Sequence, residues 1–274
     1  MNKLFGKILL VPLNLPEETL MSTLPIYVWV LVLTGLIAAI TLTCFMLYDG
    51  ARSARPGRTS PRALAIGFLV ASVVWAGLNI ALGGAGRYEF EPDRPRPLIA
   101  LVLAAGVFAI LVASRFRAVA TVLARPDAMW RLTVPQIFRV VGVAFVIVMA
   151  LGKLPAGFAI PAGVGDVAIG VEAAFLARRM RRGPVGRRAL WFNVLGLADL
   201  LVATGIAVAA APGVAHVLRL SPTTVQVSEL PLVLIPTTMV PLAVGLHVLS
   251  LRRIAVARRV VANPADVRAS KVAA

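Results

Sequence analysis

Two aspartates lie near the middle of apolar blocks of the sequence, where no water stabilises a carboxylate. Asp166 lies about ten residues into the block 156–177, and Asp199 lies about ten residues into the block 189–211. Helices formed by these consecutive blocks would be antiparallel, and at 1.5 Å per residue both aspartates would lie near the bilayer midplane. Two carboxylates in a low dielectric repel when both are ionised, so one of them should hold a proton. The pattern indicates a pair that binds a cation or relays protons.

Each carboxyl group also has a purely structural interpretation. Pro161 removes a backbone donor and so leaves one carbonyl without its helical partner. Thr237 and Thr238 place two hydroxyl groups in another apolar block. Hydrogen bonds between such groups hold helices together inside a membrane. The sequence therefore leaves two interpretations of Asp166 and Asp199 open: a protonatable pair or a packing contact.

A second set of polar residues is expected nearer the arginine-rich end of the helices. The set consists of Arg139, Glu172, Asn193 and His247. Ionisable groups inside a membrane usually face the bundle interior and have a partner. We therefore expect a buried ion pair between Arg139 and Glu172, and an inner gate formed by the four residues together. The alternative for Arg139 and His247 is that each side chain reaches the membrane surface.

Glycines and prolines accompany these polar residues. Gly163, Asp166 and Gly170 share one helix face, since they are three and seven positions apart. Small residues on such a face let a neighbouring backbone approach closely. In "IPTTMVP" Pro236 and Pro241 flank the two threonines. Interrupted helices of this kind form ion and substrate sites in transporters, although kinks also serve packing alone.

The chain is too apolar for an ordinary soluble domain. Of its 274 residues 59% are hydrophobic and 15% charged, and the mean hydropathy is +0.88, whereas soluble domains have about 45–50% apolar and about 25% charged residues. Apolar blocks close to the length that crosses a bilayer, about 20 residues, lie at 25–48, 62–84, 97–114, 134–151, 156–177, 189–211 and 231–251. We therefore expect an all-α, polytopic membrane protein with seven transmembrane helices.

The charges between the blocks predict an orientation. Basic residues exceed acidic ones in 49–62, 114–133, 178–188 and 252–274, and the segment 178–188 alone contains six arginines. The segments on the other side are nearly balanced. Because cytoplasmic loops carry the excess of Lys and Arg, we expect the N-terminus outside and the C-terminus inside. The net charge of +16 then suits an anionic lipid surface, and we expect no nucleic acid partner.

The blocks and charges divide the chain into three parts. Residues 1–24 are expected to form a periplasmic amphipathic leader, with a disordered tail as the alternative. Residues 25–251 would form the seven-helix transmembrane bundle and residues 252–274 a basic cytoplasmic tail. The expected location is the cytoplasmic (inner) membrane of a bacterium. The expected partners are the lipid bilayer, a small molecule or ion, and either another protein or further copies of the chain.

Several kinds of site lack the residues that they need. One cysteine, Cys44, and two histidines, His216 and His247, cannot supply a metal centre built from several thiolates or imidazoles within one chain. The sequence contains no HExxH, Walker or GxSxG motif, so we expect no catalytic or metal-binding residue. The block 231–251 contains no lysine, which excludes the retinal Schiff base of microbial rhodopsins.

These observations favour a small permease or a proton- or ion-coupled carrier with a polar pocket among the last four helices. Asp166 and Asp199 would be its protonatable groups, and Thr237 and Thr238 would supply hydrogen bonds. One alternative is a ligand-binding or sensing membrane module that acts through a partner, with haem bound by His247 as one version. Another is a membrane assembly factor without a ligand. The sequence does not identify a cofactor.

Overall fold

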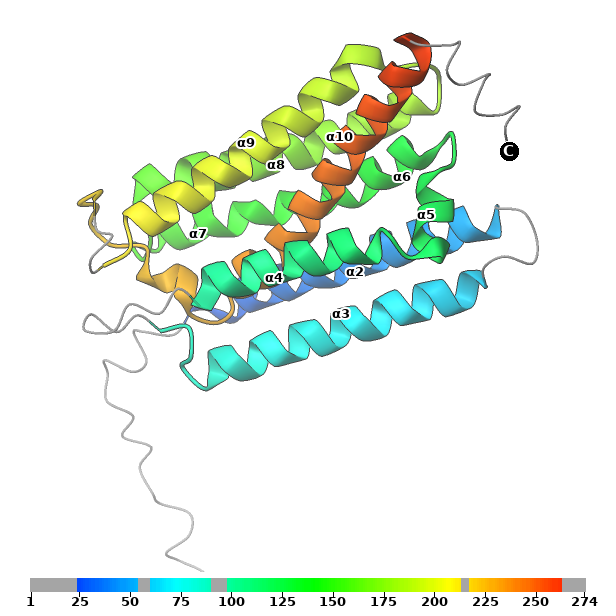
Figure 1. The fold of residues 1–274 in the computed structure, drawn as a ribbon. Helices are drawn as coiled ribbons and strands as arrows, with labels where there is room; N and C mark the ends of the chain where they lie inside the picture. The colour runs from blue at the N-terminus through cyan, green and yellow to red at the C-terminus, as the bar shows by residue number, and fades with distance from the viewer. Residues whose placement is uncertain (1–23, 54–59, 90–97, 213–216, 263–274) are drawn as a thin grey trace, which may run out of the picture.

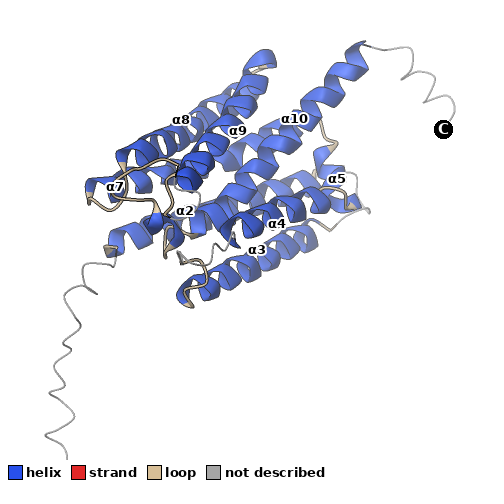
Figure 2. Cartoon of the chain, turned by 60° about the vertical axis from the view of Figure 1, so that its left-hand side comes forward, coloured by secondary structure: helices blue, strands red, loops and turns tan. Residues whose placement is uncertain are grey.

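Helices side by side make up the fold, as Figure 1 and Figure 2 show. The computed structural model describes residues 24–53, 60–89, 98–212 and 217–262, and within these ranges there is no strand. The expected all-α class is therefore confirmed. The long helices are α2 (Ile26–Arg52), α3 (Pro61–Gly84), α4 (Leu98–Ala113), α8 (Ala156–Met180), α9 (Gly186–Ala209) and α10 (Val240–Ala262).

Two of the helical spans contain irregular segments. The span Ala128–Ala150 consists of α6 (Ala128–Thr133), the 3₁₀ segment η1 (Val134–Gly142) and α7 (Val143–Ala150). The π-helical segment η3 (Ile235–Met239) leads directly into α10. Two short elements, α5 (Arg117–Leu123) and the 3₁₀ turn η2 (Val225–Ser228), lie in connections. The segment η1 packs against α2 and α8, so the irregular part of this span lies in the middle of the molecule.

In the part of the chain that the structure describes, six helices are long and apolar enough to cross a membrane, and the count becomes seven if the bent pair α4 and α5 forms one span. The axes of α4 and α5 differ by 82°. With 16 residues, α4 is about 24 Å long, which is shorter than the roughly 30 Å hydrocarbon core of a bilayer. Among the described residues, the expected seven spans are therefore found as six to seven candidate spans.

The outer surface of the bundle is apolar. Leu201 on α9 is 74% exposed and Phe108 on α4 is 69% exposed. The helix α3 buries only Ala76 and Asn79, and the rest of its apolar side chains face outward or are half-buried. Exposed apolar surface of this extent would be unfavourable in water. It is consistent with a multi-pass membrane protein.

Some expected boundaries differ from those in the structure. The last helix was expected to end at 251, but α10 continues to Ala262. The basic residues after position 251 are compatible with this extension of α10, because positive side chains near a helix C-terminus interact favourably with the helix dipole. The first part of the expected cytoplasmic tail is therefore helical. The expected leader lies, apart from Leu24, outside the described residues, as do residues 263–274.

Candidate functional site

Arg139 on η1 is the centre of a buried ionic cluster. Its side chain is 1% exposed, and its Nε donates to Oδ1 of Asp166 on α8 at 2.7 Å. Its Nη2 donates to Oδ2 of Asp199 on α9. The two aspartates therefore share one guanidinium. We call Asp166, Arg139 and Asp199 the charge cluster.

His247, held by Asn193, contacts the guanidinium at Nη1, the nitrogen that neither aspartate binds. The ring of His247 is fully buried, with Nδ1 2.9 Å from Oδ1 of Asn193 and Nε2 3.2 Å from Nη1 of Arg139. The amide nitrogen of Asn193 donates to the Ala189 carbonyl at 2.7 Å, which leaves Oδ1 as the acceptor. His247 therefore carries its proton on Nδ1 and accepts from Arg139 through Nε2. Since both ring nitrogens have partners, the haem alternative gains no support.

Glycines beside the polar side chains make room for the cluster. A Cβ atom on Gly165 would lie 1.8 Å from Oδ1 of Asp199. A Cβ atom on Gly196 would lie 2.3 Å from Nε2 of His247. Both distances are far below van der Waals contact, so any side chain at either position would displace the polar group beside it. The close approach of α8, α9 and α10 around Arg139 thus depends on these glycines.

Glu172 lies outside the charge cluster, which corrects the expected ion pair with Arg139. Its carboxylate accepts from Nε and Nη2 of Arg188 at 2.8 and 2.9 Å, in a pair that is partly open to the surroundings. Arg139 is fully buried between α8 and α9, where Asp166 and Asp199 supply its counter-charges. Glu172 lies six positions beyond Asp166 on α8 and therefore on another part of the helix surface.

The two threonines of the last span also lie outside the charge cluster. The Thr237 hydroxyl donates to the Val233 carbonyl at 2.6 Å, and the Thr238 hydroxyl donates to the Leu234 carbonyl. Each hydroxyl thus bonds to its own segment, four residues earlier. Of the residues named from the sequence, the structure brings together Asp166, Asp199, Arg139, Asn193 and His247, and it places Glu172, Thr237 and Thr238 elsewhere.

Trp75 on α3 is a structural partner that sequence reasoning missed. Pro241 has no N–H group, so the Thr237 carbonyl four residues earlier lacks its helical donor. The indole nitrogen of Trp75 donates to that carbonyl at 2.9 Å. The interrupted backbone is therefore satisfied by a neighbouring helix, as expected for irregular backbone at membrane depth. The two residues are 162 positions apart, and no local pattern links them.

A mostly apolar cavity of about 500 Å³ reaches the charge cluster. Its wall is built by α4, α7, α8 and α9, together with η2, η3 and the residues that follow α3. Asp166 is the member of the charge cluster that lines it. Tyr88 and Glu89 line it as well. We call this space the apolar cavity.

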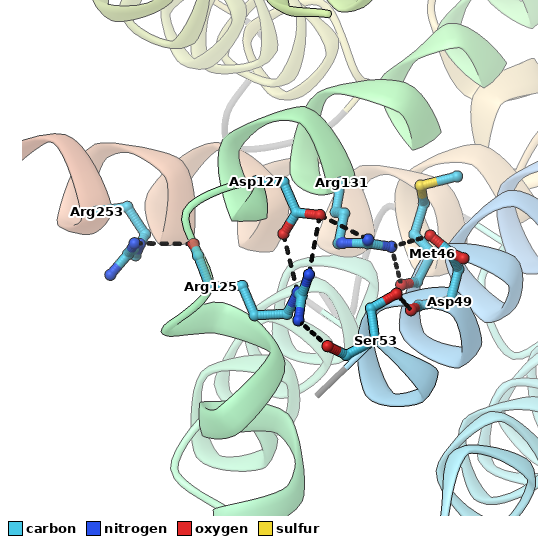
Figure 3. A network of polar contacts seen from close by, with 7 residues as sticks. All are labelled: Met46, Asp49, Ser53, Arg125, Asp127, Arg131 and Arg253. Carbon is cyan, nitrogen blue, oxygen red and sulfur yellow. Dashed lines mark hydrogen bonds and ion pairs between the residues drawn. The ribbon is translucent and has the colours of Figure 1, made fainter. Parts of the chain in front are cut away.

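A second ionic group, which sequence reasoning treated as ordinary loop charges, ties α2 to α6 at the arginine-rich end of the bundle (Figure 3). Arg131 donates to Asp49 at 2.5 Å and to Asp127 at 2.7 Å, and Arg125 donates to Asp127 at 3.0 Å. Burial raises the pKa of Asp127, but the hydrogen bonds from Arg131 and Arg125 outweigh it and hold that pKa at about 2. We call these four residues the terminal cluster.

Over the described ranges the protein is all-helical, with six to seven apolar helices that could each cross a membrane, and this is consistent with a multi-pass membrane protein. Among the described residues, no group of three or more His, Cys, Asp or Glu side chains could hold a metal ion. Residues 96–255 match the family described as Domain of unknown function (DUF8737), and the chain belongs to that family. The match contains the whole charge cluster. No curated protein and no solved structure matches the chain.

Proposed function

We propose that this protein is a small proton- or cation-coupled carrier. The observation that carries the proposal is the composition of the charge cluster, in which two carboxylates share one guanidinium. The cluster has a net negative charge when both acids are ionised, because the His247 ring beside it is neutral. A net charge inside a membrane is costly. Uptake of one proton or one cation removes that charge, so binding of such a species to the site is favourable.

The irregular helices support a role in movement. Arg139 lies on the 3₁₀ segment η1, and the π segment η3 contributes Ile235 and Pro236 to the apolar cavity. Segments of 3₁₀ and π helix inside longer helices often mark hinges and functional sites. A shift of η1 would move the guanidinium relative to Asp166 and Asp199. The affinity of the two acids for a proton would then differ between two conformations, which coupling requires.

We place the carrier in the cytoplasmic membrane of a bacterium, with the C-terminus inside. The C-terminal ends of α2 and α10, the helix α5 and the connection between α8 and α9 are rich in arginine and lie at one end of the bundle in Figure 1. Excess positive charge favours the cytoplasmic side. The residues after α3 and α9 lie at the other end. The apolar cavity includes residues from both of these connections, so it would open toward the periplasm.

The test is proton exchange in vesicles. The purified chain is reconstituted into liposomes that contain a pH-sensitive dye, and solutes are added outside by class: Na⁺, K⁺, a sugar, an amino acid, a carboxylate and an organic amine. At least one class should change the internal pH with the unaltered protein. Asp166→Asn and Asp199→Asn should each abolish that change, because each removes a carboxylate from the charge cluster.

Glu172→Gln is the matched control, since it removes an acid of the same helix that lies outside the charge cluster. This variant should exchange protons as the unaltered protein does. Exchange that persists in Asp166→Asn and Asp199→Asn would refute the role of the cluster. Absence of a response to every class of solute, in vesicles that contain folded protein, would refute the carrier function itself.

A further inference from the structure

The apolar cavity has the size and lining of a small-molecule site. Its volume of about 500 Å³ lies within the range of about 300–1,000 Å³ that is typical of ligand pockets. Phe145 and Phe158 contribute aromatic rings to the wall and contact each other edge to face, with centroids 5.2 Å apart. Leu103, Leu200 and Val240 add aliphatic surface. The wall therefore fits an apolar body rather than a sugar or another strongly hydrated molecule.

The charges in the wall all have one sign. The acids that line the cavity are Asp166 at the charge cluster and Glu89, which is exposed. Among the described lining residues there is no Arg, Lys or His. Acidic groups attract a cation and repel an anion. Tyr88, Phe145 and Phe158 also line the cavity, and aromatic rings attract a cation that lies over their faces.

Asp166 connects the cavity to the charge cluster. It is 9% exposed, it lines the cavity, and it accepts a hydrogen bond from Arg139. Arg139 and Asp199 are not among the residues that line the cavity. A bound cation would therefore meet the carboxylate first, with the guanidinium behind it. The negative charge that the cluster carries when both acids are ionised is thus presented to the cavity through one side chain.

We propose that the apolar cavity binds a monovalent organic cation, a protonated or quaternary amine on a small apolar body, in competition with a proton on the charge cluster. Either species neutralises the single surplus negative charge, so binding of the amine releases one proton. This assignment names the solute class of the proposed carrier, and its coupling step rests on that proposed function. The exchange of one proton for one organic cation leaves the cluster neutral at every stage.

The competition between the organic cation and the proton depends on the charged and titratable groups near Asp166, which come from several elements. Arg139 faces it from η1, and Asp199 faces the same guanidinium from α9. His247 on α10 contacts Arg139 and is neutral. Glu89 faces the same cavity from the segment after α3. Of these groups only Asp166 and Asp199 share the guanidinium, so the proton that an amine displaces belongs to this pair.

The test is calorimetric binding of benzyltrimethylammonium to the full chain in detergent. Binding should strengthen by up to about tenfold per pH unit over the pH range in which the charge cluster holds its proton, because one proton leaves for each cation bound, and it should no longer depend on pH once that proton is lost. Repeating the titration in buffers of different ionisation enthalpy measures that proton directly. Phenylmethanesulfonate and benzyl alcohol, an anion and a neutral molecule with the same ring, should bind about tenfold more weakly or not at all.

Three variants locate the site. Asp166→Asn should weaken binding at least about tenfold and remove its pH dependence, whereas Glu172→Gln should change neither. Ala207→Phe would fill part of the cavity without altering a charge, since Ala207 lies in its wall, and it should also weaken binding. Ala207→Phe keeps the test decisive even if Asp166→Asn does not fold.

The outcomes separate this inference from the carrier function. Equal or tighter binding of the anion or the alcohol would overturn the charge assignment, and absence of binding by all three probes would overturn the cavity as a site. If another solute class drives proton exchange through Asp166 and Asp199, the carrier function stands and the organic cation is wrong. If benzyltrimethylammonium binds with proton release but no solute drives exchange, the site is right and the carrier function is wrong.

Discussion

The charge cluster contributes little to the stability of the fold, but its net charge makes it sensitive to the binding of a proton or a cation. Burying an ion costs several kcal/mol, and attraction to a buried partner offsets this cost only when the geometry is good. Arg139 meets that condition by donating to Asp166, Asp199 and the Gly196 carbonyl, with His247 accepting from it. Among the described residues, however, the second carboxylate has no second cation as a partner. The cluster therefore stays sensitive to the arrival of a proton or another positive charge.

Replacing Gly196 by alanine should disturb the orientation of Arg139. The new methyl group would lie 2.3 Å from Nε2 of His247, so the ring must move and its hydrogen bond to Arg139 must weaken. Overpacking of this kind costs about 1–3 kcal/mol. Thermal unfolding in detergent should therefore show a lower melting temperature for Gly196→Ala.

Gly205→Ala on the same helix is the matched control. Nothing lies within 4 Å of a Cβ atom at Gly205, and alanine forms helix more readily than glycine by about 0.5–1 kcal/mol. This variant should keep or raise the melting temperature. Equal losses in the two variants would mean that α9 is merely intolerant of alanine and that the contact with His247 does not matter.

The polar residues of the site could be predicted from the sequence better than their pairing. Asp166, Asp199, Arg139 and His247 stand out because ionisable residues are rare in apolar blocks. The spacing of Arg139 from the helix end suggested a shallower position and a pairing with Glu172. No hydropathy pattern indicates that Arg139 is the shared partner of both aspartates, because this depends on how three helices pack.

At the scale of elements, η1 gives the physical reason for that error. A 3₁₀ helix rises about 2.0 Å per residue, against 1.5 Å in an α-helix. Arg139 is five residues beyond Val134, the first residue of η1, so it lies about 2.5 Å deeper than an α-helical count from Val134 would place it. The apolar blocks themselves predicted the helices well, since a bilayer-length apolar run has few alternatives. The type of helix within a block depends on tertiary contacts that the sequence does not reveal.

The terminal cluster is predicted to hold α2 against α6 in a pH-dependent manner. The pKa of Asp127 is about 2 in the folded chain, below its ordinary 3.8. A lowered pKa stabilises the fold above the ordinary value, and this stabilisation is lost as the pH falls from about 4 to about 2. Asp127→Asn should lower the free energy of unfolding by about 1 kcal/mol at neutral pH, a discounted figure because the side chain is 38% exposed.

Unfolding in detergent at several pH values checks this prediction. The difference between the unaltered protein and Asp127→Asn should shrink as the pH falls below about 4. Glu172→Gln, which breaks an exposed pair, should change the free energy of unfolding little at any of these pH values. A difference that stays constant down to about pH 2 would mean that the hydrogen bonds of the terminal cluster do not depend on the ionised form of Asp127.

At the scale of the whole molecule, the two ends of the bundle differ in chemistry. The arginine-rich connections and the terminal cluster lie at one end, whereas residues near the other end line the apolar cavity. The charge cluster lies between them, near the middle of α8 and α9. A carrier needs such a polarity, because its central site must be reached from the two sides in turn. The direction in which the bundle lies in the membrane therefore decides which compartment supplies the ligand to the cavity.

The proposed direction can be measured with single cysteines in a Cys44→Ala background, which removes the one native thiol. Ala85, directly after α3, and Gly183, between α8 and α9, are exposed, and these two segments lie at opposite ends of the bundle in Figure 1. A membrane-impermeant maleimide should label Ala85→Cys in intact cells after opening of the outer membrane. It should label Gly183→Cys only after the inner membrane is permeabilised. The reverse pattern would place the arginine-rich end outside, against the positive-inside rule, and would turn the mouth of the apolar cavity toward the cytoplasm.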